Sequence, residues 1–420
     1  MKTVTVTKTD KIVKGTLQLP FSKSISNRLM IIKAQTQGNF KITNLAGADD
    51  TLLLADLLRQ IDKSKDHKGI VELDTGNAGT AMRFLTAYLS SIPGTWILTG
   101  SERMKMRPIG ALVDALRSLG AEIDYLAKLG YPPLLVKGKF LTGGEINVDA
   151  GISSQFVSAL IMTGPCIPGG ITIHLKGEVV SKPYISMTIR LLEYFGVLVK
   201  QEKNKIIIPE SVFQANDYIV EADWSSAAFW YETAALAQEA DLILEGLHSN
   251  SIQGDSILSD IFQNLGVTTE FIENGIRIKN VKKKTNGFYF NFSDYPDIAP
   301  PVITTCAALG IRGRFEGLKS LKIKETDRLF ALTNEFKKTG IIVETSDGSN
   351  NDLSLEFPPS IMKSTHMLRM ATYGDHRMAM TFAPLALKMG TIGIEDPEVV
   401  KKSYPQFWEH LVTLGFDVAG

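Results

Sequence analysis

Lysines and arginines are concentrated near the expected starts of helices, although the chain has 45 basic and 45 acidic residues and no net charge. Lys23 and Arg28 lie at the first such start, Arg83 at the second and Arg377 at a late one. A cation at a helix N-terminus opposes the helix dipole, so it is unfavourable unless an anion binds there too. Any one of these residues could be an ordinary surface charge. Their recurrence favours a binding site for small anions.

Groups that could transfer protons lie among these cations. Asp297 precedes an apolar helix, and Glu325 lies in the Lys-Glu-Thr-Asp-Arg segment that ends at Arg328. Asp297 could instead cap its helix, and Glu325 or Asp327 could simply pair with Arg328 at helical spacing. Lys23, crowded by other cations, could have a lowered pKa suited to acid–base catalysis.

Several classes of function are disfavoured. The Gly-Asn-Ala-Gly-Thr segment 76–80 suits close approach of backbone N–H groups to an anion, but it lacks the Walker A spacing of a nucleotide loop. The zero net charge argues against a general nucleic-acid binder. Two cysteines and six scattered histidines exclude a disulfide framework and a zinc-type motif. The sequence has no apolar signal core and no stretch long enough to cross a bilayer, so we expect a cytoplasmic protein.

A repeat must position these residues. Glycines follow the ends of amphipathic helices at positions 120, 196, 266, 340 and 415. Each glycine suits the left-handed position after a helix. The copies recur at intervals of roughly 70 residues, so six of them account for the chain. A sixth, earlier copy runs from Ile42 through a helix over 51–60 and lacks the terminal glycine.

Each copy also has a second, almost wholly apolar helix before its central strand. These helices are predicted to start at Ser24, Ala78, Ser153, Ser225, Pro300 and His376. A helix that is apolar on all sides is buried. The chain is therefore predicted to be an α/β protein of six β-α-β-α-β-type units, whose helix N-termini can converge on an anion. An ordinary α/β enzyme with coincidental spacing is the less favoured alternative.

Four motifs resemble signatures of the 5-enolpyruvylshikimate-3-phosphate synthase family. They are residues 19–28 (LPFSKSISNR), 77–83 (NAGTAMR), 324–328 (KETDR) and 374–380 (GDHRMAM), and segments 103–108, 153–155 and 181–184 fit as well. The resemblance implies a two-domain inverse α/β barrel-like fold of the enolpyruvyl transferase type, with three units in each domain. It places one domain at 20–222 and the other at 1–19 plus 223–420.

The resemblance also implies a transferase. Members of the family move the carboxyvinyl group of phosphoenolpyruvate to the 5-hydroxyl of shikimate 3-phosphate and release phosphate, by addition and elimination through a tetrahedral intermediate. The reaction belongs to the shikimate pathway, which leads to chorismate and the aromatic amino acids. We therefore expect two small-molecule substrates, no cofactor, no metal, no nucleic-acid or membrane partner, and a monomer.

Site residues are implied by position within the motifs. Catalytic roles fall to Asp297, Glu325 and Lys23. Shikimate 3-phosphate is expected to contact Lys23, Ser24, Arg28, Ser153, Ser154, Gln155, Ser181, Tyr184, Asp297 and Lys324. Phosphoenolpyruvate is expected to contact Lys23, Gly79, Arg107, Gln155, Arg328, Arg377 and Lys402. His376 could be an acid, a base or an orienting donor, and it is not assigned a catalytic role.

Departures from the family pattern are few. Phe21 replaces the usual Gly, Phe84 replaces a Pro found in several relatives, and Ser320 replaces an Asn that some relatives place on the sugar phosphate. Phe21 and Phe84 leave sensitivity to glyphosate, the family's inhibitor, undecided. Two alternatives share the fold, namely an enolpyruvyl transferase acting on a UDP-sugar and a non-catalytic anion-binding paralogue. The UDP-sugar enzyme usually carries a reactive Cys in a mobile loop, and neither Cys of this chain occupies such a loop among basic residues. The paralogue would have lost residues such as Lys23 that this chain retains.

Overall fold

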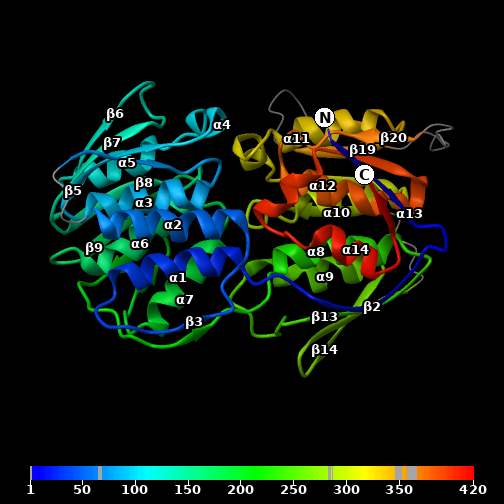
Figure 1. The fold of residues 1–420 in the computed structure, drawn as a ribbon, viewed down its shortest axis with the longest axis horizontal. Helices are drawn as coiled ribbons and strands as arrows, with labels where there is room; N and C mark the ends of the chain where they lie inside the picture. Colours follow the sequence, from blue (N-terminus) through cyan, green and yellow to red (C-terminus); the bar gives the residue numbers. More distant parts are fainter. Residues whose placement is uncertain (1, 65–68, 282–284, 286, 346–351, 357–366) are drawn as a thin grey trace. The chain divides into compact units, whose positions relative to one another are not determined.

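A computed structural model describes residues 2–64, 69–281, 285, 287–345, 352–356 and 367–420 (Figure 1). The chain divides into two compact units. Unit 1 consists of Met1–Ser22 and Glu221–Gly420, and unit 2 consists of Lys23–Val220. Unit 2 is thus an insertion in the sequence of unit 1.

One strand arrangement recurs, and the sheet of β4 to β7 illustrates it. Strand β4 (Val71–Asp74) is parallel to β5 (Gly94–Thr99), and the buried helix α3 (Gly79–Ser90) connects them. Strand β7 (Leu134–Gly138) then pairs with β5 in the antiparallel sense, and β6 (Glu122–Tyr125) pairs with β7. A parallel pair with a helical crossover is therefore extended by an antiparallel hairpin.

Four more sheets have this order. They are β8 (Gly144–Asp149), β9 (Ile171–Lys176), β11 (Lys205–Ile208) and β10 (Lys200–Glu202); β2 (Ile12–Gln18), β13 (Glu239–Glu245), β15 (Gly275–Asn280) and β14 (Val267–Ile272); β16 (Phe288–Asn291), β17 (Gly313–Glu316), β19 (Leu353–Glu356) and β18 (Ile342–Thr345); and β20 (Leu368–Met370), β21 (Ile392–Glu395), β1 (Thr3–Thr7) and β22 (Asp417–Ala419). In the described part of the chain, a sixth sheet consists of the parallel pair β12 (Tyr218–Ile219) and β3 (Ile42–Thr43). Among the described residues the sheets stay separate rather than joining in a closed barrel.

Six buried helices form the centres of the two units, as the sequence predicts. In unit 2, helices α1 (Lys23–Gln35), α3 and α6 (Ser154–Thr163) contact one another. In unit 1, helices α8 (Trp224–Leu236), α10 (Ala299–Leu309) and α12 (His376–Phe382) do so. Each begins within two residues of its predicted start. The prediction of six buried helices is therefore confirmed.

A second set of helices lies outside the first. It comprises α2 (Asp49–Lys63), α5 (Gly110–Ser118), α7 (Lys182–Tyr194), α9 (Leu258–Asn264), α11 (Arg328–Lys337) and α14 (Phe407–Thr413). The described residues also form short turns of helix: α4 (Glu102–Lys105), α13 (Ala386–Met389), η1 (Gly164–Cys166), η2 (Gly254–Ile257), η3 (Lys319–Ile323), η4 (Ala383–Leu385) and η5 (Pro397–Lys402). The five predicted helix-ending glycines have φ between 78° and 93°, the left-handed conformation that a glycine adopts without strain.

Both ends of the chain contribute to one sheet of unit 1. Strand β1 lies between β21 and β22 and is antiparallel to both. Strand β2 is parallel to β13 along its whole length, although all of unit 2 separates them in sequence. Unit 1 is therefore assembled from the two extremities of the polypeptide.

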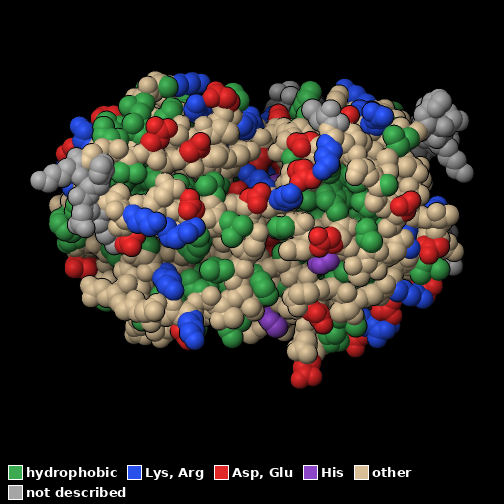
Figure 2. Space-filling model, viewed as in Figure 1, with side chains coloured by type: hydrophobic (Ala, Val, Ile, Leu, Met, Phe, Trp, Pro, Cys, Tyr) green, Lys and Arg blue, Asp and Glu red, His purple; other side chains and the backbone are tan. Residues whose placement is uncertain are grey.

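Charged side chains of both signs are interspersed over the face shown in Figure 2. This mixture agrees with the balanced composition of the chain. No helix among the described residues is long and apolar enough to span a membrane.

Candidate active site

Arg328, at the start of α11, is the centre of an ionic network inside unit 1. Its side chain is 1% exposed. Nε donates to Oδ2 of Asp375 at 2.8 Å, and Nη2 donates to Oε2 of Glu325 at 2.9 Å. Nη1 donates to Oδ1 of Asp297 at 3.1 Å. Burial alone would lower the pKa of Arg328, but these carboxylates raise it, so the guanidinium stays charged.

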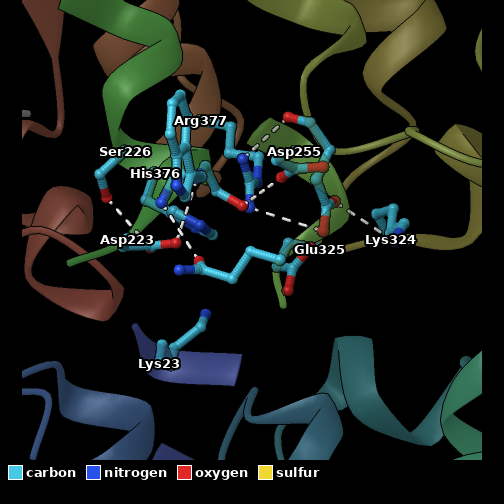
Figure 3. Close-up of polar contacts among 12 residues, drawn as sticks. Lys23, Asp223, Ser226, Asp255, Lys324, Glu325, His376 and Arg377 are labelled. Carbon is cyan, nitrogen blue, oxygen red and sulfur yellow. Dashed lines mark hydrogen bonds and ion pairs between the residues drawn. The ribbon is translucent and has the colours of Figure 1, made fainter. Parts of the chain in front are cut away.

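Asp297 lies just before α10, and three cations surround its carboxylate. Two of these cations, Lys324 and Arg377, are labelled in Figure 3. Besides the bond from Arg328, Nζ of Lys324 is 3.3 Å from Oδ1 and Nη2 of Arg377 is 3.5 Å from Oδ2. Burial raises the pKa of Asp297, but the charges of the surrounding cations outweigh it and hold that pKa well below its usual range. The N-cap position of α10 belongs to Ile298. Asp297 is therefore an ionised carboxylate inside a cationic shell.

Asp375 links this network to α12. Its carboxylate caps the helix by accepting from the backbone N of Arg377 at 2.8 Å. The Arg377 side chain then donates from Nη1 to the backbone O of Asp297 at 2.8 Å. His376 is 2% exposed, with Nδ1 3.5 Å from Oδ1 of Asp375. This arrangement fixes the start of α12 against the start of α10.

One more cation, Lys402, borders the network, and burial perturbs Lys324 within it. Lys402, at the end of η5, has Nζ 3.4 Å from Oε1 of Glu325. Burial lowers the pKa of Lys324, against the opposing effect of Asp297. The two oxygens of Glu325 thus contact different cations, Arg328 and Lys402. Pairing of Glu325 with Arg328, which the sequence left open, is present.

A third acidic residue, Asp255 in η2, lies close to this network. Its carboxyl accepts a hydrogen bond from the Ser225 hydroxyl at the start of α8. Burial, reinforced by the negative charge of Asp297, raises the pKa of Asp255 to about 7. Near neutral pH both its protonated and its ionised forms are therefore populated.

Unit 2 contains a different kind of cationic centre. Nζ of Lys23, at the start of α1, lies 2.9 Å from Oδ2 of Asp50 in the first turn of α2. The charged group that binds Lys23 is thus a carboxylate, whereas neighbouring cations were expected from the sequence.

Arg28 is buried in α1 without a carboxylate in hydrogen-bonding contact among the described residues. Nε donates to the hydroxyl of Thr188 at 2.7 Å, and Nη2 donates to that of Ser158 at 3.1 Å. The ring of Phe84 lies 5.4 Å from Cζ, and that of Tyr184 lies 5.8 Å away. Burial lowers the pKa of Arg28 to about 10. A buried cation held only by neutral acceptors favours an anion nearby.

Helix starts in unit 2 carry the remaining predicted ligands. Ser153 caps α6, and its Oγ accepts from the backbone N of Gln155 at 3.3 Å. A Cβ on Gly79 would lie only 2.9 Å from Nη2 of Arg107, so the glycine permits this arginine to approach α3. Ser181, before α7, has a φ of 54°. The first turns of α1, α3, α6 and α7 contain no acidic residue.

A family model described as EPSP synthase (3-phosphoshikimate 1-carboxyvinyltransferase) matches residues 7–411. A 3-phosphoshikimate 1-carboxyvinyltransferase of Bacteroides fragilis (strain YCH46) is 44% identical over 407 residues, which cover 97% of this chain and 96% of the relative. Another with that name from Sulfurovum sp. (strain NBC37-1) is 36% identical and covers 96% and 97%. The chain belongs to the EPSP synthase family.

A solved EPSP synthase of Acinetobacter baumannii has a TM-score of 0.77 to this chain over all of both chains, at 23% identity. This likeness shows that the fold is that of EPSP synthases. The family match and the curated relatives do not favour the UDP-sugar transferase or the non-catalytic paralogue.

EPSP synthase motifs divide between the two units. Unit 1 brings six predicted site residues into one connected network: Asp297, Lys324, Glu325, Arg328, Arg377 and Lys402. Unit 2 holds the others near the starts of α1, α3, α6 and α7: Lys23, Ser24, Arg28, Gly79, Arg107, Ser153, Ser154, Gln155, Ser181 and Tyr184. Ser320, in η3, has a buried hydroxyl with no hydrogen-bond partner among the described residues.

Sequence reasoning missed the acidic partners. Asp50, Asp255 and the carboxylate role of Asp375 all depend on contacts between distant segments. The paired acids Asp49 and Asp50 at the start of α2 were the one local signal for a carboxylate beside Lys23. For Asp255, the Gln-Gly-Asp segment offered no signal of its own.

Proposed function

We propose that this chain transfers the carboxyvinyl group of phosphoenolpyruvate to the 5-hydroxyl of shikimate 3-phosphate and releases inorganic phosphate. Membership of the EPSP synthase family and the names of its curated relatives support this reaction. The observation that carries the proposal is the buried network in which Lys324, Arg328 and Arg377 surround Asp297. Substrates with phosphates and carboxylates suit such a concentration of fixed positive charge.

Shikimate 3-phosphate is assigned to the residues that match the family's contacts for it, namely Lys23, Ser24, Arg28, Ser153, Ser154, Gln155, Ser181, Tyr184, Asp297 and Lys324. Phosphoenolpyruvate is assigned to Lys23, Gly79, Arg107, Gln155, Arg328, Arg377 and Lys402. The acid-free first turns in unit 2 leave backbone N–H groups that favour phosphate. Arg28 would act mainly through its charge, since its Nε and Nη2 groups already bind Thr188 and Ser158.

Asp297 is assigned the role of base. In the first step the 5-hydroxyl oxygen bonds to C2 of phosphoenolpyruvate, the hydroxyl proton goes to Asp297, and a proton is added to C3. The low pKa of Asp297 without substrate makes it a weak base. Substrate anions that bind Lys324 and Arg377 would partly neutralise those cations, and this would increase the affinity of Asp297 for a proton.

Glu325 and Lys23 are assigned the proton transfers at C3. One group protonates C3 to give the tetrahedral intermediate. A proton is then lost from C3 as the C–O bond to phosphate breaks, and the electron pair restores the vinyl group. Fixed cations such as Arg107 and Lys402 would stabilise the charge on the departing phosphate.

One assay tests the reaction. Purified protein should release phosphate from phosphoenolpyruvate when shikimate 3-phosphate is present, but not when it is omitted or replaced by a UDP-sugar. Mass spectrometry should detect the carboxyvinyl ether of shikimate 3-phosphate in equal amount. Phosphate release that depends on the UDP-sugar would overturn the proposal.

The residue roles need separate tests. Asp297→Asn and Glu325→Gln preserve side-chain volume, and each should lower kcat by about 100-fold or more, the usual effect of losing a general acid or base. Asp297→Ala and Glu325→Ala should show similar losses. Circular dichroism and thermal melting control for folding. A variant that folds and keeps near-normal turnover would refute the role of its residue.

Assembly and location are part of the same proposal. We expect a monomer that works in the cytoplasm, with domains at 20–222 and at 1–19 plus 223–420. Light scattering after size exclusion measures the mass in solution, cell fractionation tests the location, and limited proteolysis tests the boundaries. A stable dimer or a membrane-associated protein would refute the corresponding expectation.

A further inference from the structure

The turn that leads into α12 has an unfavourable backbone conformation. Tyr373 has a φ of 55° and Gly374 a φ of 70°, so two successive residues are left-handed. Glycine adopts this conformation freely, whereas a bulky aromatic residue rarely does. Such a residue persists only where surrounding contacts hold it.

Helix α11 supplies those contacts. The Tyr373 hydroxyl donates to Oε1 of Glu335 at 2.7 Å and accepts from Nδ2 of Asn334 at 2.6 Å. The Tyr373 ring also meets Phe330 edge to face, with centroids 6.0 Å apart. Burial, with help from Glu335, raises the pKa of Tyr373 to about 12. The hydroxyl is therefore a donor at any pH at which the enzyme would work.

Glu335 holds the turn at a second point. Its side chain is wholly buried, and Oε2 accepts from the backbone N of Ala371 at 3.1 Å. Nζ of Lys338 lies 2.5 Å from the same oxygen and also donates to the backbone O of Arg369. The Glu335 carboxylate thus binds both Ala371, where the chain enters the turn, and the side chain of Tyr373 at the centre of the turn.

The same helix binds the end of the turn. Arg328 is seven residues before Glu335, so both lie on one face of α11. Arg328 binds Asp375, and Asp375 in turn accepts from the backbone N of Arg377. The position of Arg377 therefore depends on a turn that α11 fixes at Ala371, Tyr373 and Asp375.

We propose that Tyr373, held by Glu335, is a positioning residue that aims Arg377 at its anionic ligand. The proposal rests on the proposed function, because phosphoenolpyruvate is the ligand assigned to Arg377. Tyr373 acts through the turn. Loss of its hydroxyl should therefore impair binding of that ligand more than it slows the chemical steps.

Tyr373→Phe removes the hydroxyl and keeps the ring. We expect KM for phosphoenolpyruvate to rise about tenfold, as when one hydrogen bond to a charged group no longer stabilises the binding conformation. KM for shikimate 3-phosphate and kcat should change by less than about twofold. A residue needed only for folding would not separate the two KM values in this way.

Tyr289→Phe is the matched control. It also removes one tyrosine-to-glutamate hydrogen bond, from Tyr289 to Oε2 of Glu316 at 2.8 Å, but it does so on an exposed strand. Its kinetics should match the wild type. Tyr373→Gly separates conformation from anchoring, because glycine accepts a left-handed φ but has no hydroxyl. It should raise the same KM at least as much as Tyr373→Phe.

Hydrogen exchange gives a readout that needs no activity. In Tyr373→Phe the amides of residues 371–378 should exchange faster, while those of α10 and the melting temperature stay close to wild type. Unchanged exchange, or faster exchange with unchanged KM values, would overturn the positioning role. A wild-type protein that fails to turn over would refute the proposed function, and exchange would still test whether Tyr373 fixes the turn.

Discussion

Arg328 and Asp375 bind each other inside unit 1 through two hydrogen bonds, from Nε to Oδ2 at 2.8 Å and from Nη2 to Oδ1 at 3.4 Å. Arg328→Met should therefore leave buried carboxylates without their central cation. We expect the free energy of unfolding to fall by about 3–5 kcal/mol, as for other broken buried ion pairs. Urea denaturation measures this loss. Arg314→Met, which breaks an exposed pair with Glu316, should cost under about 1 kcal/mol. Equal losses of unfolding free energy in Arg328→Met and Arg314→Met would show that burial of the ion pair does not determine the loss.

Two acids of one motif should behave differently. Asp327 caps α11, and its Oδ1 accepts from the backbone N of Phe330 at 3.0 Å, whereas Glu325 binds Arg328 and Lys402. Asp327→Ala should lower stability by about 1 kcal/mol through loss of the cap and leave turnover near normal. Glu325→Ala should abolish most turnover. Thermal melts measure the stability of the two variants, and phosphate-release kinetics measure their turnover. A catalytic defect in Asp327→Ala would contradict the assignment of Asp327 to capping alone.

Glu232 should make the protein less stable as the pH rises. It is wholly buried in α8, and neither carboxyl oxygen has a hydrogen-bond partner among the described residues. Burial raises the pKa of Glu232 well above its usual value in the folded state. Above the unfolded pKa of about 4.3, only the unfolded chain gains charge, so each pH unit costs about 1.4 kcal/mol until the folded pKa is reached.

Glu232→Gln should therefore match the wild type near pH 4 and become increasingly more stable than it as the pH rises from about 5 towards the folded pKa of Glu232. Chemical denaturation across this range gives the difference. Glu239→Gln, at an exposed glutamate, is the control and should show no such trend. A constant difference between Glu232→Gln and the wild type would mean that Glu232 does not titrate as inferred.

Two glycines test the cost of close packing. Gly310 and Gly317 have similar φ values, 68° and 72°. A Cβ on Gly310 would meet nothing within 4 Å, while one on Gly317 would overlap Ser293 and lie 2.5 Å from Oδ1 of Asn291. Gly310→Ala should cost about 1–2 kcal/mol for its left-handed backbone alone. Gly317→Ala should cost about 1–3 kcal/mol more through the overlap. If urea denaturation gave the same loss of unfolding free energy for both variants, the overlap at Gly317 would add no cost.

The sequence predicted the helices well because their signals are local. An apolar run, a capping residue and a terminal glycine are all found within the helix that they predict or next to it. Ser153 caps α6 as expected, and Gly196, predicted to end a helix, takes a left-handed φ after α7. The last repeat shows how far such a pattern can vary. Asp396 takes a left-handed φ of 48° after β21, where Gly177 and Gly246 follow the equivalent strands.

The partners of the charged residues were not predictable in this way. Cations at helix starts suggested missing anions, but the protein itself supplies several of them: Asp50 faces Lys23, and Asp375 faces Arg328. These pairs join residues 27 and 47 positions apart, across separate elements. Periodicity carries no information about such pairs, since they depend on how distant helices pack.

The position of β1 imposes an order on biosynthesis. Its register partners, Ile392–Glu395 and Asp417–Ala419, are translated only after the whole of unit 2. A nascent chain on the ribosome must therefore carry β1 unpaired until these later strands have been made, whereas the contiguous segment Lys23–Val220 can fold as soon as it emerges.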